Sequence, residues 1–178
     1  IDLPRKVRFK PRKRFVHKKV DTGCRIGRNY EDFLSFLSDH PGIPVTQLDS
    51  VEGTRGGKVL LTIHFSETEL MLAFIRDSNT SRSVTRIFSS LYDLLGHELF
   101  SSIFRVCLAD NGTEFSNPKA IEFSPDGSIR TRLFYCDPSS PFQKGSAERN
   151  HEFIRFFIPK GHSLDHLSQD DISLMMDH

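Results

Sequence analysis

Apolar residues recur with the 3.6-residue period of an amphipathic helix in three parts of the chain, and we expect helices there. The first segment lies at 30–37, the second at 84–95 and the third at about 146–158. On a helical projection, the apolar arc of the third segment consists of Phe153, Ile154, Phe157 and Ile158.

Local signals predict where the first two helices begin and end. The run His40-Pro41-Gly42 ends the first helix, since proline and glycine interrupt helical geometry. The second helix has Ser81 or Ser83 as its N-cap, and Gly96 is its expected stop.

Five shorter segments have the composition of β-strands. They lie at 45–52, 58–65, 69–77, 104–109 and 132–136. The short link Ser66-Glu67-Thr68 predicts a hairpin between the second and third. Three meandering strands, a helix and two further strands with crossovers predict an α/β fold with one mixed sheet flanked by helices.

Basic residues are concentrated at the start of the chain. Residues 1–20 contain nine Lys or Arg and one Asp, a net charge of +8, whereas the other 158 residues contain fifteen Lys or Arg and 22 Asp or Glu, a net charge of −7. Bulky apolar residues alternate with these cations, which favours a phosphate-binding arm over a solvated linker. The candidate DNA-binding residues are Arg12, Lys13, Arg14, Lys18 and Lys19.

Composition excludes several other classes of protein. The hydrophobic share of 37% and the charged share of 26% are typical of a globular domain, and no apolar run approaches the roughly 20 residues that span a bilayer. No apolar segment of a secretory signal follows the basic start. We expect Cys24, Cys107 and Cys136 to be reduced intracellular thiols. The first residue is Ile1, so we expect a fragment of a longer protein.

Three acidic residues, Asp49, Asp110 and Glu148, lie on different predicted elements. The first two are in or directly after strands, and the third is at the start of the last helix. Carboxylates that converge from separate elements repel one another, and a divalent cation removes this repulsion. Such a cluster is the core of two-metal phosphoryl transfer, so we expect a protein that cuts or joins nucleic acid.

The runs RIGRNYEDFLSFL, LADNGTEFSNPKAIEF and YCDPSSPFQKGSAERNHEFIRFFIPKG together resemble the transposases of the insertion-sequence-thirty family, within the DDE superfamily. The resemblance extends from about Gly23 to Ser168. Sixty residues lie between Asp49 and Asp110, and 37 lie between Asp110 and Glu148, which agrees with the short second gap of that superfamily. The chain departs from the family pattern in having no Trp before Asp49 and in having Phe142 where the family has Trp or Tyr.

The resemblance implies a ribonuclease-H-like fold with a mixed five-stranded sheet. It implies a basic linker or arm at 1–22, leading from an upstream DNA-recognition region, and a DDE catalytic core at 23–178. It implies DNA strand cleavage and strand transfer with two Mg²⁺ ions, for which Mn²⁺ can substitute. The implied partners are transposon-end and target DNA and further copies of the chain, with no membrane, in the bacterial cytoplasm.

The expected role of each site residue follows from its chemistry. Asp49 would bridge both metal ions, Asp110 would hold one, and Glu148 would hold the second from the first turn of its helix. Asn111, Lys144 and Arg149 are candidate phosphate contacts. Other residues are expected to be structural: Glu114, Glu122 and Glu152 as solvated charges, His162 and His166 as a surface pair, and the Phe-rich stretches as core or as a surface between copies.

Two alternatives remain open at this point. One is a simple ribonuclease-H-type nuclease that acts on RNA–DNA hybrids, against which the Pro-Phe-Gln-Lys-Gly loop before Glu148 argues. The other is a domesticated transposase that only binds DNA, which would have no need of three intact carboxylates.

Overall fold

The computed structural model describes residues 22–138 and 140–177, without the side chains of Thr22, Pro141 and residues 145–149. The arm residues Arg12, Lys13, Arg14, Lys18 and Lys19 therefore lie outside the described residues.

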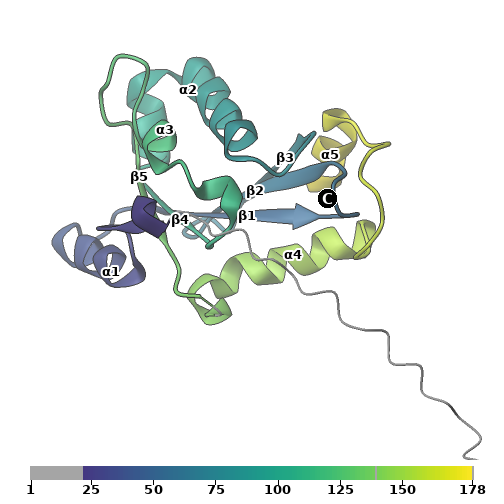
Figure 1. Ribbon diagram of the computed structural model, residues 1–178, viewed down its shortest axis with the longest axis horizontal. Coiled ribbons are helices and arrows are strands. Elements are labelled where there is room, and N and C mark those ends of the chain that lie inside the picture. The colour runs from purple at the N-terminus through teal and green to yellow at the C-terminus, as the bar shows by residue number, and fades with distance from the viewer. Residues whose placement is uncertain (1–21, 139, 178) are drawn as a thin grey trace, which may run out of the picture.

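A mixed five-stranded sheet forms the centre of the fold, as predicted (Figure 1). The strand order is β3-β2-β1-β4-β5. β1 pairs antiparallel with β2 and β2 pairs antiparallel with β3, while β1, β4 and β5 run parallel. The strands are β1 Val45–Glu52, β2 Val59–Phe65, β3 Met71–Arg76, β4 Val106–Ala109 and β5 Arg132–Tyr135.

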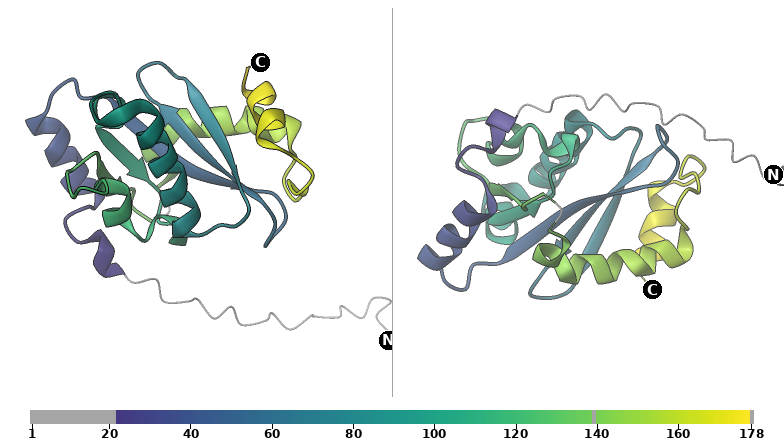
Figure 2. Two further views of the ribbon diagram at one scale, coloured as in Figure 1. Left: turned by 90° about the horizontal axis from the view of Figure 1, so that it is seen from above. Right: turned by 60° about the horizontal axis from the view of Figure 1, so that its bottom comes forward.

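Helices cover both faces of the sheet. α2 lies across one face with α3 beside it, and Figure 2 shows α4 along the opposite face, with α5 next to the β3 edge. The α-helices are α1 Tyr30–Asp39, α2 Ser81–Ile103, α3 Pro118–Glu122, α4 Gly145–Phe157 and α5 Gln169–Met176. The 3-10 turns are η1 Thr22–Arg25, η2 Thr113–Phe115 and η3 Pro141–Lys144. Within the described ranges, no helix has both the length and the apolar composition needed to cross a membrane.

Side chains of β1 alternate between two apolar cores because successive residues of a strand point to opposite faces. Leu48 is in the core under α2, with Phe88 and Phe100. Val51 is in the core under α4 and α5, with Ile154. A third cluster joins α1 to β4 and the edge strand β5. Asp49 therefore belongs to the face that α4 covers.

The second helix differs from its prediction at both ends. Gly96 is a break rather than a stop, since its backbone leaves helical geometry (φ 74°, ψ 168°) and the helix then continues to Ile103. The continuation buries Phe100 completely, with its ring centroid 4.6 Å from that of Phe104. Thr80, and neither Ser81 nor Ser83, is the N-cap, because its side chain accepts the Ser83 N–H.

The prediction that Glu114 and Glu122 are solvated charges is wrong. Glu122 is 3% exposed, and its carboxylate accepts two bonds from Arg28, at 3.0 Å from Nε and 2.6 Å from NH2. Glu122 also accepts the backbone N–H of Leu133 at 3.1 Å, on the open edge of β5. Glu114 is 5% exposed, packed under the Gly112 backbone. Glu114 is in the 3-10 turn η2 and Glu122 is the last residue of the short helix α3, and both side chains are buried.

The β3 edge is closed by a helix that the sequence pattern did not predict. Gln169, the first residue of α5, accepts the Ile75 N–H at 2.9 Å and donates to the Ala73 carbonyl at 3.0 Å. One side-chain amide thus replaces a missing neighbour strand, which protects the edge from pairing with another chain.

The apolar arc predicted for the last helix is half wrong. Ile154 and Ile158 are buried, whereas Phe153 and Phe157 are 67% and 53% exposed, and Phe156 is 82% exposed. Among the described side chains, the buried strip along α4 is narrow and consists of the two isoleucines, which are four residues apart. Phe33, in contrast, is in the core, as expected.

The remaining structural expectations are confirmed. The three cysteines are free, with Cys107 and Cys136 buried and Cys24 half-buried. His162, His166 and Glu152 are exposed.

Candidate metal centre between β1, β4 and α4

Strand register places Asp49 and Asp110 side by side. Leu48 of β1 pairs with Ala109 of β4 in the parallel ladder, and the two aspartates are the next residues on each chain. Ala109 packs on the α2 side, so Asp110 follows onto the opposite side, which is also the side of Asp49. Two carboxylates therefore meet on the face of the sheet that α4 covers.

Lys144 contacts Asp49 directly. Its Nζ lies 2.9 Å from Asp49 Oδ2 and donates to the Leu48 carbonyl at 3.1 Å, and its side chain is 8% exposed. The other oxygen, Asp49 Oδ1, accepts the Ser50 N–H at 2.7 Å. Lys144 was expected to be a phosphate contact, which stays a prediction, and the structure places its ammonium against the first carboxylate.

His151 approaches the same carboxylate from the next turns of α4. Its Nδ1 lies 3.9 Å from Asp49 Oδ2, and its Nε2 lies 2.8 Å from the Thr62 hydroxyl on β2. Thr62 is the register partner of Asp49 and also donates to the Asp49 carbonyl at 3.3 Å. The imidazole is thus held between β2 and the carboxylate, a position that sequence reasoning did not assign to it.

The site disfavours the charged form of Asp110. Burial raises the pKa of Asp110, and the charge of Asp49 raises it further. The Lys144 ammonium and the bond from the Gly112 N–H to Oδ1, at 2.9 Å, act in the opposite direction but do not cancel these effects. A carboxylate pair with uncancelled repulsion has the donor chemistry of a divalent cation site.

Asn111 has a structural role in the described fold, and its phosphate contact stays a prediction. Its side-chain amide donates to the Cys136 carbonyl at 2.6 Å, and its own carbonyl accepts from Arg25 NH2 at 2.7 Å. These bonds tie the end of β4 to the end of β5 and to η1, so they hold the Asp110 backbone in place.

The backbone of α4 places position 148 between two residues that face Asp49. Lys144, the N-cap residue of α4, and His151 both approach the Asp49 carboxylate, and Glu148 lies between them along the chain, three residues before His151. Residues three apart in a helix are neighbours on its surface. Glu152, one turn beyond position 148, lines a groove with Leu70 and Phe156 near the β3 edge.

The described side chains therefore give two of the three expected ligands. The side chains of Glu148 and Arg149 lie outside the described part, and no group of three metal-ligating residues occurs among the side chains that are described. Lys144 and His151 are the two site residues whose roles sequence reasoning missed. The spacing of residues 144, 148 and 151 along the chain was the sequence signal that could have brought these two residues to the site.

Replacing Asp110 with Asn should stabilise the metal-free protein at neutral pH. The native pKa of Asp110 is raised, so its proton is bound more tightly in the folded state, and the wild type loses stability as pH rises through the range of that pKa. Asn keeps the acceptor for the Gly112 N–H but carries no charge. Melting in EDTA should show the variant melting higher at pH 7, with the difference vanishing near about pH 3, below the ordinary Asp pKa. A variant that melts at a lower temperature than the wild type at pH 7 would contradict the repulsion between the Asp49 and Asp110 carboxylates.

Known proteins with related sequences are transposases, although no protein-family model matches the chain. The "Probable transposase for insertion-like sequence element IS1161" of Streptococcus salivarius is 27% identical over 172 residues, which cover 96% of this chain and 45% of that protein. The "Transposase InsI for insertion sequence element IS30A" of Escherichia coli strain K12 is 25% identical over 127 residues, which cover 71% of this chain and 31% of that protein. The chain spans less than half the length of these curated relatives.

The fold also occurs among solved structures. A chain of the cryo-EM structure of the simian T-cell lymphotropic virus intasome in complex with PP2A regulatory subunit B56 gamma superposes with a TM-score of 0.50 at 15% identity. The match covers 75% of this chain and 47% of that chain. The likeness supports the ribonuclease-H-like arrangement of the mixed sheet. The sequence relatives and the fold together support a likeness of the folded part of the chain to the catalytic core of insertion-sequence-thirty transposases.

Proposed function

We propose that this core cuts DNA strands and joins them to new DNA, with two divalent metal ions held by Asp49, Asp110 and Glu148. The observation that carries the proposal is the placement of Asp49 and Asp110 directly after the paired residues Leu48 and Ala109 of the parallel strands β1 and β4, on the side of the sheet that α4 covers. A bound pair of Mg²⁺ or Mn²⁺ ions would supply activation of the attacking oxygen and stabilisation of the leaving one.

The protein's own residues would bind the metal ions in this site and keep one another in the required orientation. Asp49 is the central ligand, because Ser50, Thr62 and His151 fix its backbone and carboxylate. Asp110 is held by the Gly112 N–H. His151 is a positioning residue, since it reaches Asp49 from a ring anchored on Thr62. Rigid neighbours of this kind keep metal ligands in their productive orientation.

The test is nicking of supercoiled DNA by the purified chain. Mg²⁺ or Mn²⁺ should be required, and EDTA should stop the reaction. Nicking that persists in EDTA would contradict metal-dependent cleavage. DNA binding without nicking in either metal would favour the domesticated, DNA-binding alternative.

Lys144 should compete with the metal for Asp49. Its ammonium lies 2.9 Å from the carboxylate, where it neutralises the charge that would attract a cation. A like charge within a few ångströms opposes ion binding by on the order of 1 kcal/mol in a partly exposed site. Calorimetry should therefore show Mn²⁺ binding to Lys144→Met about 5-fold to 10-fold more tightly than to wild type.

The matched control is Lys119→Met, which removes an exposed lysine from α3. Its Mn²⁺ affinity should equal that of the wild type. Unchanged or weaker binding by Lys144→Met, with normal melting, would show that Lys144 supports the metal site in some other way. Release of Lys144 on metal binding would free it for the phosphate contact expected from the sequence.

The N-terminal segment is proposed to be a separate DNA-binding arm at 1–22, ahead of the core at 23–178. Deleting residues 1–20 removes nine Lys or Arg, so DNA binding should weaken and its dependence on salt should flatten by roughly 0.9 in logarithmic slope per lost phosphate contact. Fluorescence anisotropy over a salt series measures this slope. Changing Arg12, Lys13, Arg14, Lys18 and Lys19 to Gln in the full chain should reproduce most of the effect, and an unchanged slope would make the arm a passive linker.

The proposed partners are transposon-end and target DNA, bound by a homo-oligomer of the full protein. The chain covers only part of its relatives, so recognition of the transposon ends is assigned to the whole protein rather than to this core.

A further inference from the structure

A second basic site lies at the other end of the sheet. A surface pocket of about 420 Å³ is lined by the end of α1, by α2 beyond Gly96, and by residues at the starts of β4 and β5. Arg105 directly precedes β4 and Arg132 begins β5, whereas Asp110 directly follows β4. Arg105 and Asp110 lie at opposite ends of the four-residue strand β4, five residue steps apart, which is about 16 Å at 3.3 Å per residue. The pocket is therefore distinct from the carboxylate site.

Three arginines line this pocket, and two of them have no partner. Arg105 and Arg132 are neighbours, since the Arg132 N–H donates to the Arg105 carbonyl at 3.2 Å. Both side chains are exposed, and neither guanidinium has a hydrogen-bond or ion-pair partner among the described residues. Glu98 is the one carboxylate among the described lining residues, so the charge of the lining is positive even with neutral histidines.

Arg130 gives the pocket a buried cation. It is 2% exposed, and its guanidinium lies 5.2 Å from the Tyr92 ring centroid and 5.5 Å from that of Phe100. Nε and NH2 donate to the carbonyls of Ile121 and Ala120, at 2.9 and 3.0 Å. NH1 is buried without a hydrogen-bond partner in the described structure, and so is the hydroxyl of Ser101, another lining residue. Buried donors are rarely left unpaired, so these two point to a missing acceptor.

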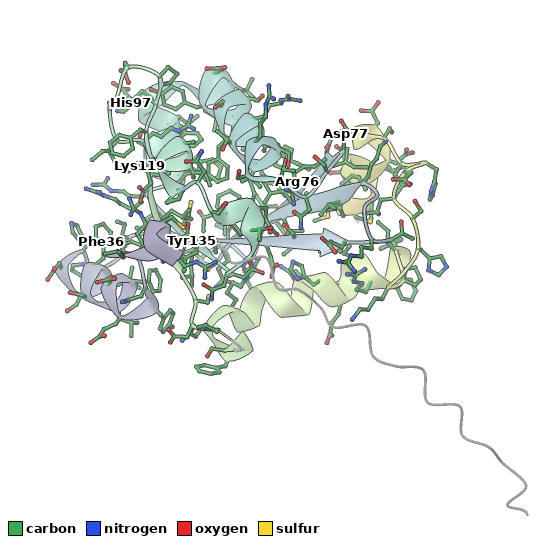
Figure 3. All side chains as sticks on the ribbon, in the orientation of Figure 1. Phe36, Arg76, Asp77, His97, Lys119 and Tyr135 are labelled. Atoms are coloured by element: carbon green, nitrogen blue, oxygen red, sulfur yellow. The ribbon has the colours of Figure 1, made fainter. Side chains whose placement is uncertain are left out.

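Two histidines on the rim are held in fixed positions. His40 Nδ1 bonds the Phe36 carbonyl at 2.9 Å, and its ring stacks on Phe36 with centroids 4.2 Å apart. His97 Nδ1 lies 3.2 Å from the Tyr92 hydroxyl. Figure 3 labels Phe36 on α1 and His97 on α2, and His40 directly follows α1 as its C-cap. In both rings Nε2 is left without a partner in the described part of the chain.

We propose that this pocket binds a phosphate group. Guanidinium groups match the geometry of phosphate oxygens, and adjacent unpaired arginines with a buried third favour a multiply charged oxyanion over a single carboxylate. The phosphate would come either from the backbone of a DNA segment other than the one at the carboxylates or from free phosphate. The site does not depend on the proposed catalytic function, because it shares no residue with the carboxylate cluster.

The test compares Arg105→Gln/Arg132→Gln with Arg82→Gln/Arg86→Gln in the full chain. The control pair removes two exposed α2 arginines that also have no partner among the described residues, so the change in net charge is the same. The buried Arg130 is kept, so that folding is preserved. Inorganic phosphate and pyrophosphate are titrated by calorimetry, and a short DNA duplex of mixed sequence is titrated over a salt series.

Phosphate or pyrophosphate should bind to the wild type and to the control variant with similar affinity. Its binding to the Arg105→Gln/Arg132→Gln variant should be at least about 10-fold weaker. If DNA is the source, that variant should also lower the salt slope of duplex binding by roughly 1 to 2, and the control should not. An unchanged DNA slope with weakened phosphate binding would assign the pocket to free phosphate. Equal effects of the two double variants, or no phosphate binding by the wild type together with an unchanged DNA slope, would overturn the proposal.

Discussion

Asp49→Asn, Asp110→Asn and Glu148→Gln will each reduce nicking of supercoiled DNA by more than about 100-fold. Loss of residues that only orient a metal ligand typically costs about 10-fold to 100-fold, and these three are proposed as the ligands themselves. Each change conserves side-chain volume and removes negative charge from a crowded site, so the fold should remain intact. Circular dichroism and melting in EDTA check the fold, and agarose gels of plasmid nicking measure the activity.

Glu152→Gln is the matched control for the third ligand. Glu152 is on the same helix, one turn beyond Glu148, but it is exposed and lines the groove by the β3 edge. A full turn is about 5.4 Å along the helix axis, whereas a magnesium ligand lies about 2.1 Å from the ion, so both glutamates cannot serve. Glu152→Gln should retain near-wild-type nicking. An inactive Glu152→Gln beside an active Glu148→Gln would show that the helix register assigned to this site is wrong.

Glu122→Ala should destabilise the protein by about 3–5 kcal/mol, the usual cost of removing one member of a buried ion pair. The change leaves the Arg28 guanidinium without its bidentate partner and leaves the Leu133 N–H unsatisfied on the β5 edge. Hydrogen bonding to Glu122 raises the pKa of Arg28, which is consistent with a charged, strongly paired guanidinium. Urea unfolding should report the loss as a lower midpoint at a similar slope.

The double variant Arg28→Met/Glu122→Leu distinguishes a lost ion pair from a lost packing position. Replacing both charges with apolar side chains removes the uncompensated charge, so the double variant should be more stable than Glu122→Ala. Glu67→Ala, in the exposed β2–β3 turn, should change stability by less than about 0.5 kcal/mol. A Glu122→Ala variant as stable as Glu67→Ala would contradict the structural role assigned to the buried pair.

Elements with a strong local pattern were predictable from the sequence. β1 occupies the predicted segment because its side chains alternate between two cores and Pro44 and Gly53 bound it. α2 was predicted only as far as Gly96, since the pattern cannot show that Phe100 and Phe104 beyond the break complete the same core. α5 was missed because it is short and its position depends on distant contacts, the bonds of Gln169 to the β3 edge and the packing of Ile172 in the core under α4 and α5.

Long-range pairing explains the errors among the charged residues. Glu122 is buried because Arg28, 94 positions away, neutralises it, and no local signal gives that partner. The same limit applies to Lys144, whose neighbours in sequence suggest a phosphate contact while the fold places Asp49 against it. The neighbouring positions of Asp49 and Asp110 were predictable, because Asp49 lies within one strand-like segment and Asp110 directly follows another.

The most direct measurement of the central claim is anomalous diffraction from crystals of the wild-type chain soaked in Mn²⁺. We expect a manganese peak within coordination distance of the carboxylate oxygens of both Asp49 and Asp110, with Glu148 as a further ligand and Lys144 moved away from Asp49. The peak should be absent from Asp49→Asn crystals soaked in the same way. A wild-type map with Lys144 still bound to Asp49 and no manganese at the two aspartates would contradict the proposed metal centre.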